Sequence, residues 1–169
     1  MSARKPGSAK VMLLGDIGVG KSSLARRFVF DKFETDYKTT IGVDVLTHDV
    51  LLGPECDGAN LRLVLWDTDG DFGNRIFETV YVAGASGAII VADASRPATL
   101  VKMAALARRF SEEFPGRPAA LIVNKIDLAP RLRETGVEGH GDVLFSSAMT
   151  GEGVNELFAT LAAAIWRRA

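Results

Sequence analysis

A glycine-rich segment near the N-terminus constrains the fold of this chain more than any other feature of its sequence. Residues 15–22 read Gly-Asp-Ile-Gly-Val-Gly-Lys-Ser and directly follow an apolar run at residues 11–14. Glycines allow the backbone to turn tightly and to approach a ligand closely. The apolar run is typical of a strand, and the residues after Ser22 are typical of the start of an amphipathic helix. A strand, a glycine-rich turn and a helix N-terminus in this order predict a loop that binds phosphate groups.

The residue types in this loop suit a nucleoside triphosphate together with Mg²⁺. Successive backbone N–H groups and the helix N-terminus can surround anionic oxygens. Lys21 is placed to reach the outer phosphates, and the hydroxyl of Ser22 is placed to ligate Mg²⁺. The loop does not by itself select the base. The residues expected to contact the nucleotide here are Gly15, Gly18, Val19, Gly20, Lys21, Ser22 and Ser23.

Length and charge exclude several classes of protein. The 169 residues are enough for one domain with a buried core. The net charge of −1 argues against a general nucleic-acid-binding protein, which usually carries a basic stripe. We expect a flexible tail over residues 1–9 and a single domain over residues 10–169. No apolar run approaches the roughly 20 residues of a membrane span. The single cysteine, Cys56, excludes an internal disulfide and is interpreted as an ordinary loop thiol of a cytoplasmic protein.

Strand-like and helix-like patterns alternate along the chain. Strands are predicted at residues 10–14, 43–52, 61–66, 87–92, 119–124 and 143–146, and helices at residues 21–31, 74–82, 99–114 and 154–168. The second and third strands flank a turn-rich stretch and predict an antiparallel hairpin. The remaining alternation predicts an open, mostly parallel α/β sheet of about six strands with helices on both faces. The glycine-rich stretch 130–141 predicts a short or absent helix before the last strand.

Four further segments carry polar residues at informative places. The first follows the first helix, and the other three lie near the predicted carboxyl ends of strands, where ligands of such sheets bind. They read Tyr-Lys-Thr-Thr-Ile-Gly at 37–42, Trp-Asp-Thr-Asp-Gly at 66–70, Asn-Lys-Ile-Asp at 124–127 and Ser-Ser-Ala at 146–148. Together with the phosphate-binding loop, they closely resemble the five sequence blocks of the Ras superfamily of small GTPases, which have a P-loop NTPase fold. Residues 15–16 and 39–44 are most similar to the Rab branch, and the resemblance extends from about residue 10 to residue 164.

The resemblance implies roles around the phosphates and the metal. Thr40 resembles the switch I threonine, whose hydroxyl ligates Mg²⁺ and whose backbone contacts the γ-phosphate. Asp67 resembles the carboxylate that holds Mg²⁺ through water, and Ser22 resembles a direct ligand. Gly70 resembles the glycine whose N–H binds the γ-phosphate and anchors switch II. The implied ligands are GTP and GDP, with Mg²⁺ as the cofactor.

A second set of residues is implied to bind guanine. Asn124 and Asp127 match the residues that read the base, and a carboxylate such as Asp127 can accept two N–H bonds that adenine does not offer. The other residues in this implied set are Phe33 on the edge of the base, Lys125 along its face, and Ser147 and Ala148 in the last segment, where the backbone of Ala148 contacts the guanine oxygen.

The chain departs from the family's pattern near the implied site of hydrolysis. Asp71 occupies the position of the glutamine that orients the attacking water, and an ionised carboxylate only accepts hydrogen bonds. Two unit charges about 4 Å apart repel by roughly 4 kcal/mol at an effective dielectric constant of 20. Asp69 replaces a small alanine, and Ile17 would crowd an arginine finger from an activating partner. Lys21, Thr40, Gly70 and Asp71 therefore form the expected catalytic set, and we predict slow hydrolysis of GTP.

Several functions stay open at this point. The first is a slow GTP/GDP switch in signalling, trafficking or polarity control, which binds effector, exchange-factor and activating proteins through residues 37–42 and 70–82. The second is a GTP-locked scaffold without hydrolysis, and a third is a form that prefers GDP. Arg75 or a partner's residue is a candidate for the missing catalytic group. Trp66 and Phe72 are candidates for effector contact, with core packing as the alternative for Trp66.

The C-terminal residues 166–169 contain no cysteine for prenylation, so we expect no lipid anchor of that kind in this chain. Either the protein is recruited to membranes by partners or a longer tail has been removed. We expect a cytoplasmic monomer.

Overall fold

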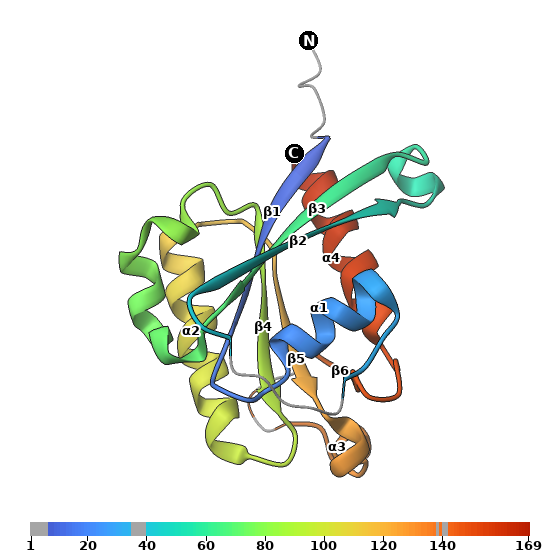
Figure 1. The fold of residues 1–169 in the computed structure, drawn as a ribbon. Helices are drawn as coiled ribbons and strands as arrows, with labels where there is room; N and C mark the ends of the chain where they lie inside the picture. The colour runs from blue at the N-terminus through green and yellow to red at the C-terminus, as the bar shows by residue number, and fades with distance from the viewer. Residues whose placement is uncertain (1–6, 35–39, 138, 140–141) are drawn as a thin grey trace.

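The computed structural model describes residues 7–34, 40–137, 139 and 142–169, and these form one twisted sheet with helices on both faces (Figure 1). The strands are β1 (Ser8–Gly15), β2 (Val43–Leu51), β3 (Asn60–Thr68), β4 (Gly87–Asp93), β5 (Ala119–Asn124) and β6 (Val143–Phe145). The helices are α1 (Lys21–Phe30), α2 (Pro97–Glu113), α3 (Leu132–Thr135) and α4 (Val154–Arg168). Short 3₁₀ segments cover Pro54–Cys56, Gly70–Glu78, Val80–Val82 and Ile126–Leu128.

The strand order is β2-β3-β1-β4-β5-β6, with β2 and β3 antiparallel and the other neighbouring pairs parallel. This arrangement confirms the predicted α/β fold. The register also aligns polar residues at the carboxyl ends of the strands, because Asp67 lies opposite Leu13 and Asn124 lies opposite Asp93. The sheet therefore gathers these side chains at one edge, where ligands of parallel sheets bind.

Side chains of β1 alternate between two hydrophobic cores, as expected for a strand buried on both faces. Val11 and Leu13 pack in the core under α1 and α4, whereas Met12 and Leu14 pack in the core under α2. The rings of Phe28 and Phe158 stack with centroids 4.0 Å apart and join α1 to α4.

The segment after β3 differs from its prediction. Instead of a helix over residues 74–82, the chain forms two 3₁₀ segments, Gly70–Glu78 and Val80–Val82. Gly73 has a φ of 50° and interrupts the first segment, and Thr79 is extended between the two. Ile76, Phe77 and Val82 are buried against the α2 face of the sheet. Tertiary packing of these apolar residues therefore holds a segment whose backbone does not form a regular helix.

Other boundaries differ less. β1 begins at Ser8 rather than at residue 10, and residues 1–6 of the expected tail lie outside the described part of the chain. The helix after β5 has only four residues, as the glycine-rich sequence predicts. Cys56 was expected to be an ordinary loop thiol, but it is 1% exposed and packs with the core under α1 and α4. The thiol lies in the connection between β2 and β3, as expected, and it is buried because the 3₁₀ turn Pro54–Cys56 directs the side chain inward.

Candidate functional site

The glycine-rich loop connects β1 to α1 and wraps around the side chain of Lys21. Gly20 has a φ of 104°, and a Cβ at this position would overlap the side-chain amide of Asn124, so glycine is required here. The Lys21 ammonium donates to the carbonyl oxygens of Gly15 and Asp16, each at 2.9 Å. Burial lowers the pKa of Lys21 to about 8, although the negative charges of Asp67, Asp16 and Asp69 oppose this shift.

Two residues from the end of β5 hold the other side of the loop. The Lys125 ammonium donates to the carbonyl of Gly18 at 2.7 Å, and the Asn124 amide donates to the carbonyl of Val19 at 3.0 Å. Lys125 itself has a φ of 61°, a left-handed conformation at the start of the 3₁₀ turn Ile126–Leu128. The segment Asn-Lys-Ile-Asp is therefore joined to the phosphate-binding loop by direct hydrogen bonds.

Three oxygen-bearing side chains from distant parts of the sequence meet beside α1. The hydroxyls of Ser22 and Thr40 are 2.7 Å apart, and Ser22 also donates to the carboxylate of Asp67. The Oδ1 atom of Asp67 is buried and has no hydrogen-bond partner among the described residues. Burial raises the pKa of Asp67, with the hydrogen bond from Ser22 acting in the opposite direction.

This cluster fits a divalent cation. Hydroxyl and carboxylate oxygens are hard ligands of the kind that Mg²⁺ prefers, and Mg²⁺ keeps several waters. A cation nearby would also compensate the buried carboxylate, whose unpaired oxygen is otherwise costly. No three His, Cys, Asp or Glu residues come together as another metal site within the part of the chain that the structure describes.

A pocket of about 300 Å³ extends from the loop and the metal cluster towards the end of β6. Of the residues expected to bind nucleotide or metal, Gly18, Gly20, Lys21, Ser22, Ser23, Phe33, Thr40, Gly70, Asn124, Lys125, Asp127 and Ala148 line this pocket. Gly15, Val19, Asp67 and Ser147 do not line it, and the last three are buried behind its wall.

The far end of the pocket is built from side-chain amide, carboxylate and hydroxyl groups. Oδ1 of Asn124 accepts from the hydroxyl of Ser146 at 3.0 Å and from the N–H of Ala148 at 3.3 Å. The hydroxyl of Ser147 donates to Oδ1 of Asp127 at 2.7 Å. These bonds fix the orientation of two side chains that can read the donor and acceptor pattern of a base.

Sequence reasoning missed several residues that shape the pocket. Arg26, Lys32 and Thr68 line it, and Arg27 holds its base end by donating to the carbonyls of Ala148 and Met149 at 2.8 and 2.5 Å. A charged residue on an exposed helix face gives no local signal for such a contact, because it depends on α1 lying beside the β6–α4 connection.

The segment after β3 directs Asp71 away from the pocket. The N–H of Asp71 donates to the Asp69 carboxylate at 2.9 Å, and Arg75 donates to the Asp71 carbonyl at 2.9 Å. Asp71 lines a second hollow, of about 330 Å³, between this segment and α2. Gly70 borders both hollows, and a Cβ there would overlap the backbone of Ile17. Arg75, a candidate catalytic group, contacts the Asp71 backbone rather than its carboxylate.

Trp66 and Phe72, the aromatic candidates for effector contact, are partly covered by neighbouring side chains. The rings of Trp66 and Phe72 lie 6.4 and 6.0 Å from Tyr81, and the Lys10 ammonium lies 3.7 Å above the Trp66 ring. Both Trp66 and Phe72 are half-buried against the α2 core, so packing and surface exposure coexist at these positions. Residues 37–39 of the other implied switch lie outside the described residues.

The structure combines a mostly parallel α/β sheet, a phosphate-binding loop, an oxygen cluster suited to Mg²⁺ and a polar base end. Together these features define a P-loop nucleotide-binding protein. Residues 10–167 match the model of the Ras family, and the chain belongs to that family.

Several relatives are of the Rab and Ypt type. The chain is 36% identical over 162 residues to the GTP-binding protein ypt5 of Schizosaccharomyces pombe, covering 90% of this chain and 75% of the relative. It is 35% identical over 164 residues to the Ras-related protein SEC4 of Saccharomyces cerevisiae, covering 90% and 73%. It is 32% identical over 165 residues to the Ras-related protein Rab-5B of Plasmodium falciparum, covering 94% and 78%. The chain is therefore a Ras-superfamily small GTPase close to the Rab branch. None of the helices in the described residues has the length and apolar character to cross a membrane.

Proposed function

We propose that this protein is a guanine-nucleotide switch that binds GTP or GDP with Mg²⁺ in the 300 Å³ pocket and hydrolyses GTP slowly. The observation that carries the proposal is that one pocket is lined by three kinds of group. Residues of the phosphate-binding loop, the metal cluster and the base end all border it, and a nucleoside triphosphate with Mg²⁺ needs contacts of all three kinds. Residues 10–169 act as one domain in this proposal, which is supported by the continuous six-stranded sheet of the described residues, and we propose that the protein is a monomer.

The phosphate end uses the loop from Gly15 to Ser23. Lys21 exchanges its two backbone carbonyl partners for phosphate oxygens when nucleotide binds. Its lowered pKa, about 8, leaves most of the population charged at pH 7. Ser22 and Thr40, with Asp67 acting through water, would hold Mg²⁺, which would supply positive charge to the phosphates.

The base end favours guanine. Asn124 and Asp127 are held by Ser146, Ser147 and the Ala148 backbone, so they present fixed acceptors and donors to the base. Phe33 and Lys125 also line this pocket. Adenine would leave the Asp127 carboxylate without its two donors, and an unpaired buried acceptor opposes binding.

Slow hydrolysis follows from the position of Asp71. Its backbone is tied to Asp69 and Arg75, and its side chain lies on the hollow beside α2 rather than on the nucleotide pocket. A carboxylate there orients no water for attack on the γ-phosphate. Ile17, within the loop, is 36% exposed and would obstruct a cation supplied by a partner.

The switch itself needs different contacts in the two nucleotide states. Thr40 and Gly70 border the phosphate end and connect it to residues 37–42 and 70–82. The γ-phosphate would order both segments, and its loss would release them, so that effector, exchange-factor and activating proteins distinguish the states. The Rab-type relatives support a role in trafficking, polarity or signalling, with a cytoplasmic protein recruited to membranes by partners.

A GTP-locked scaffold is the second candidate, favoured by the same position of Asp71. The two candidates share nucleotide binding and differ in turnover. Denaturing the freshly purified protein and separating its nucleotides by ion-pair chromatography tests both. We expect mostly GTP. Single-turnover hydrolysis then separates the two candidates, because a slow switch hydrolyses the bound GTP and a scaffold does not.

Mostly GDP would contradict slow hydrolysis or reveal a preference for GDP. A protein that is empty and binds neither GTP nor GDP at micromolar concentrations would contradict the proposed ligand class. The variant Arg62→Ala, on the distant β2–β3 hairpin, is the control and should carry the same nucleotide as the wild type.

A further inference from the structure

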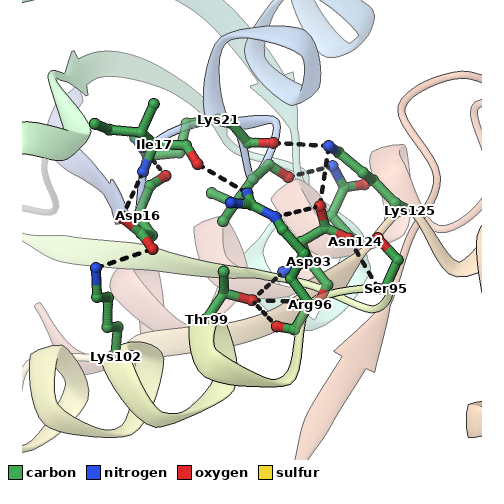
Figure 2. A network of polar contacts seen from close by, with 12 residues as sticks. Asp16, Ile17, Lys21, Asp93, Ser95, Arg96, Thr99, Lys102, Asn124 and Lys125 are labelled. Atoms are coloured by element: carbon green, nitrogen blue, oxygen red, sulfur yellow. Dashed lines mark hydrogen bonds and ion pairs between the residues drawn. The ribbon is translucent and has the colours of Figure 1, made fainter.

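Each backbone carbonyl from residue 15 to residue 19 of the phosphate-binding loop accepts a hydrogen bond from a side chain. Figure 2 shows how Arg96 contacts Ile17 and Asp93. Lys21 donates to the carbonyls of residues 15 and 16. Asn124, the last residue of β5, and Lys125, which follows it, donate to the carbonyls of residues 19 and 18. The Ile17 carbonyl, at the centre of the loop, accepts from Nη2 of Arg96 at 2.8 Å. Arg96 lies outside all the segments that sequence analysis singled out, in the turn between β4 and α2.

Arg96 is oriented by a buried carboxylate. Its Nε atom donates to Oδ2 of Asp93 at 3.0 Å, and the Asp93 side chain is only 2% exposed. The N–H and the hydroxyl of Ser95 donate to the other Asp93 oxygen at 2.9 and 2.7 Å. Burial opposes ionisation of Asp93, but the hydrogen bonds from Ser95, Lys125 and Arg96 outweigh it and lower its pKa. Asp93 is therefore a fixed anion.

The same anion holds a second cation. The Lys125 ammonium lies 3.0 Å from Oδ2 of Asp93 and donates to the Gly18 carbonyl. Asp93 thus positions the cationic groups of Arg96 and Lys125. Each also donates a hydrogen bond to the carbonyl of one of two consecutive loop residues, 17 and 18. Arginine suits its position because its planar fork can bind a carboxylate and a carbonyl through different nitrogens at once.

These contacts act on the inner side of the loop through the peptide bonds. The Ile17 carbonyl belongs to the same peptide unit as the Gly18 N–H, and the Gly18 carbonyl to that of the Val19 N–H. The N–H groups of Gly18, Val19 and Gly20 have no acceptor among the residues that the structure describes. A cationic donor on the carbonyl side fixes the direction of each N–H and polarises it, which favours an anion on the inner side.

We propose that Arg96 is a positioning residue for nucleotide binding, which holds the Ile17–Gly18 peptide with its N–H turned towards the phosphates and thereby slows nucleotide release. This inference rests on the proposed function. It assigns a role to a residue that does not line the proposed nucleotide pocket and that acts on it through the Ile17 carbonyl.

The test measures release of a fluorescent GDP analogue from the Mg²⁺-loaded protein, with thermal unfolding of each variant measured in parallel. Arg96→Ala should release the analogue about three- to tenfold faster, the usual effect of losing one charge-assisted hydrogen bond from a half-exposed donor. Arg96→Lys keeps the charge beside Asp93 but lacks the fork, so it should unfold near the wild-type temperature and still release faster than wild type.

Arg62→Ala is the matched control. It also removes an arginine paired with an aspartate, at 2.8 Å from Asp49, but on the distant hairpin. Its release rate should equal that of the wild type. Lys102→Ala removes a cation that pairs with the Asp16 side chain at 3.0 Å rather than with a loop carbonyl, and should change release less than Arg96→Ala does.

A release rate of Arg96→Ala within twofold of wild type overturns the inference, whether or not its unfolding temperature falls. If Arg96→Ala does not fold, Arg96→Lys decides, and a wild-type rate for that variant overturns it. A wild-type protein that binds no GDP analogue contradicts the proposed function itself, whereas tight binding with unchanged variants contradicts only the role of Arg96.

Discussion

At the scale of single residues, the structure separates the groups that touch the nucleotide pocket from those that only neighbour it. Asp71 and Gly70 are adjacent in sequence, yet Gly70 borders the pocket and Asp71 lines the hollow beside α2. The Asp69 carboxylate accepts from the Asp71 N–H and begins the 3₁₀ segment. The Asp69 carboxylate, which departs from the family's pattern, thus helps to direct the backbone that carries Asp71.

Replacing Asp71 tests whether one side chain limits hydrolysis. Asp71→Gln supplies both a donor and an acceptor with one more methylene. Once the γ-phosphate orders residues 70–82 as proposed, this longer side chain can reach the attacking water, so we expect single-turnover GTP hydrolysis to become at least about tenfold faster. Asp71→Asn removes the charge without adding length and is the matched control, with a smaller gain expected. Equal rates for all three proteins would contradict this prediction and direct attention to Ile17.

Replacing Asp67 tests the metal cluster. Burial raises the pKa of this carboxyl, so its ionised form destabilises the metal-free fold at neutral pH and one oxygen lacks a partner. Asp67→Asn should therefore raise the free energy of unfolding in EDTA by about 1 kcal/mol and abolish most of the stabilisation by Mg²⁺ with nucleotide. Urea unfolding with and without Mg²⁺ measures both effects, and an unchanged Mg²⁺ response would show that the cation binds elsewhere.

At the scale of elements, the site depends on how α1 and α4 pack together. The stacked rings of Phe28 and Phe158 lie in the core below the loop that carries Ala148. Arg27, beside Phe28 in α1, holds that loop through two carbonyls. Packing between the two helices therefore sets the position of the base end relative to the phosphate end.

Removing one of these rings should destabilise the fold strongly. Phe158 is fully buried, and Phe158→Ala should lower the free energy of unfolding by about 3–5 kcal/mol through lost burial and a cavity. Phe30 in α1 is 54% exposed, and Phe30→Ala should cost well under half as much. Urea denaturation compares the two, and similar losses for both variants would contradict the assigned core.

At the scale of the whole molecule, the charge of Lys21 couples folding, pH and binding. Its pKa in the folded protein is about 8, below the ordinary 10.5, because it is buried. Between these values the unfolded chain binds more protons than the folded one, so the stability of the nucleotide-free protein should rise with pH from about 8 to 10.5.

Nucleotide affinity should show the opposite trend, because phosphate oxygens bind the protonated ammonium. We expect the dissociation constant for GDP to rise about tenfold between pH 7 and pH 9 at constant salt. Fluorescence titration of a GDP analogue measures this, and a flat profile over that range would contradict the role of Lys21 at the phosphates.

The sequence by itself determined the class of fold, since alternating apolar patterns and a glycine-rich turn depend on residues close together in the chain. Ala119–Asn124 and Val154–Arg168 match their predicted bounds, and the short helix Leu132–Thr135 follows from a glycine-rich stretch. The segments that resemble the Ras superfamily also predicted which strand ends would carry polar side chains.

Only the tertiary structure decided the features that depend on contacts between distant segments. The residues after Gly70 have an amphipathic pattern, yet packing against α2 and the interruption at Gly73 give two 3₁₀ segments. Cys56 is buried because its turn folds onto the core, and Arg96 meets Ile17 because β1 and β4 are neighbours. Local sequence specifies a backbone conformation, but the partner of a buried or charged side chain is set by the register and order of the strands.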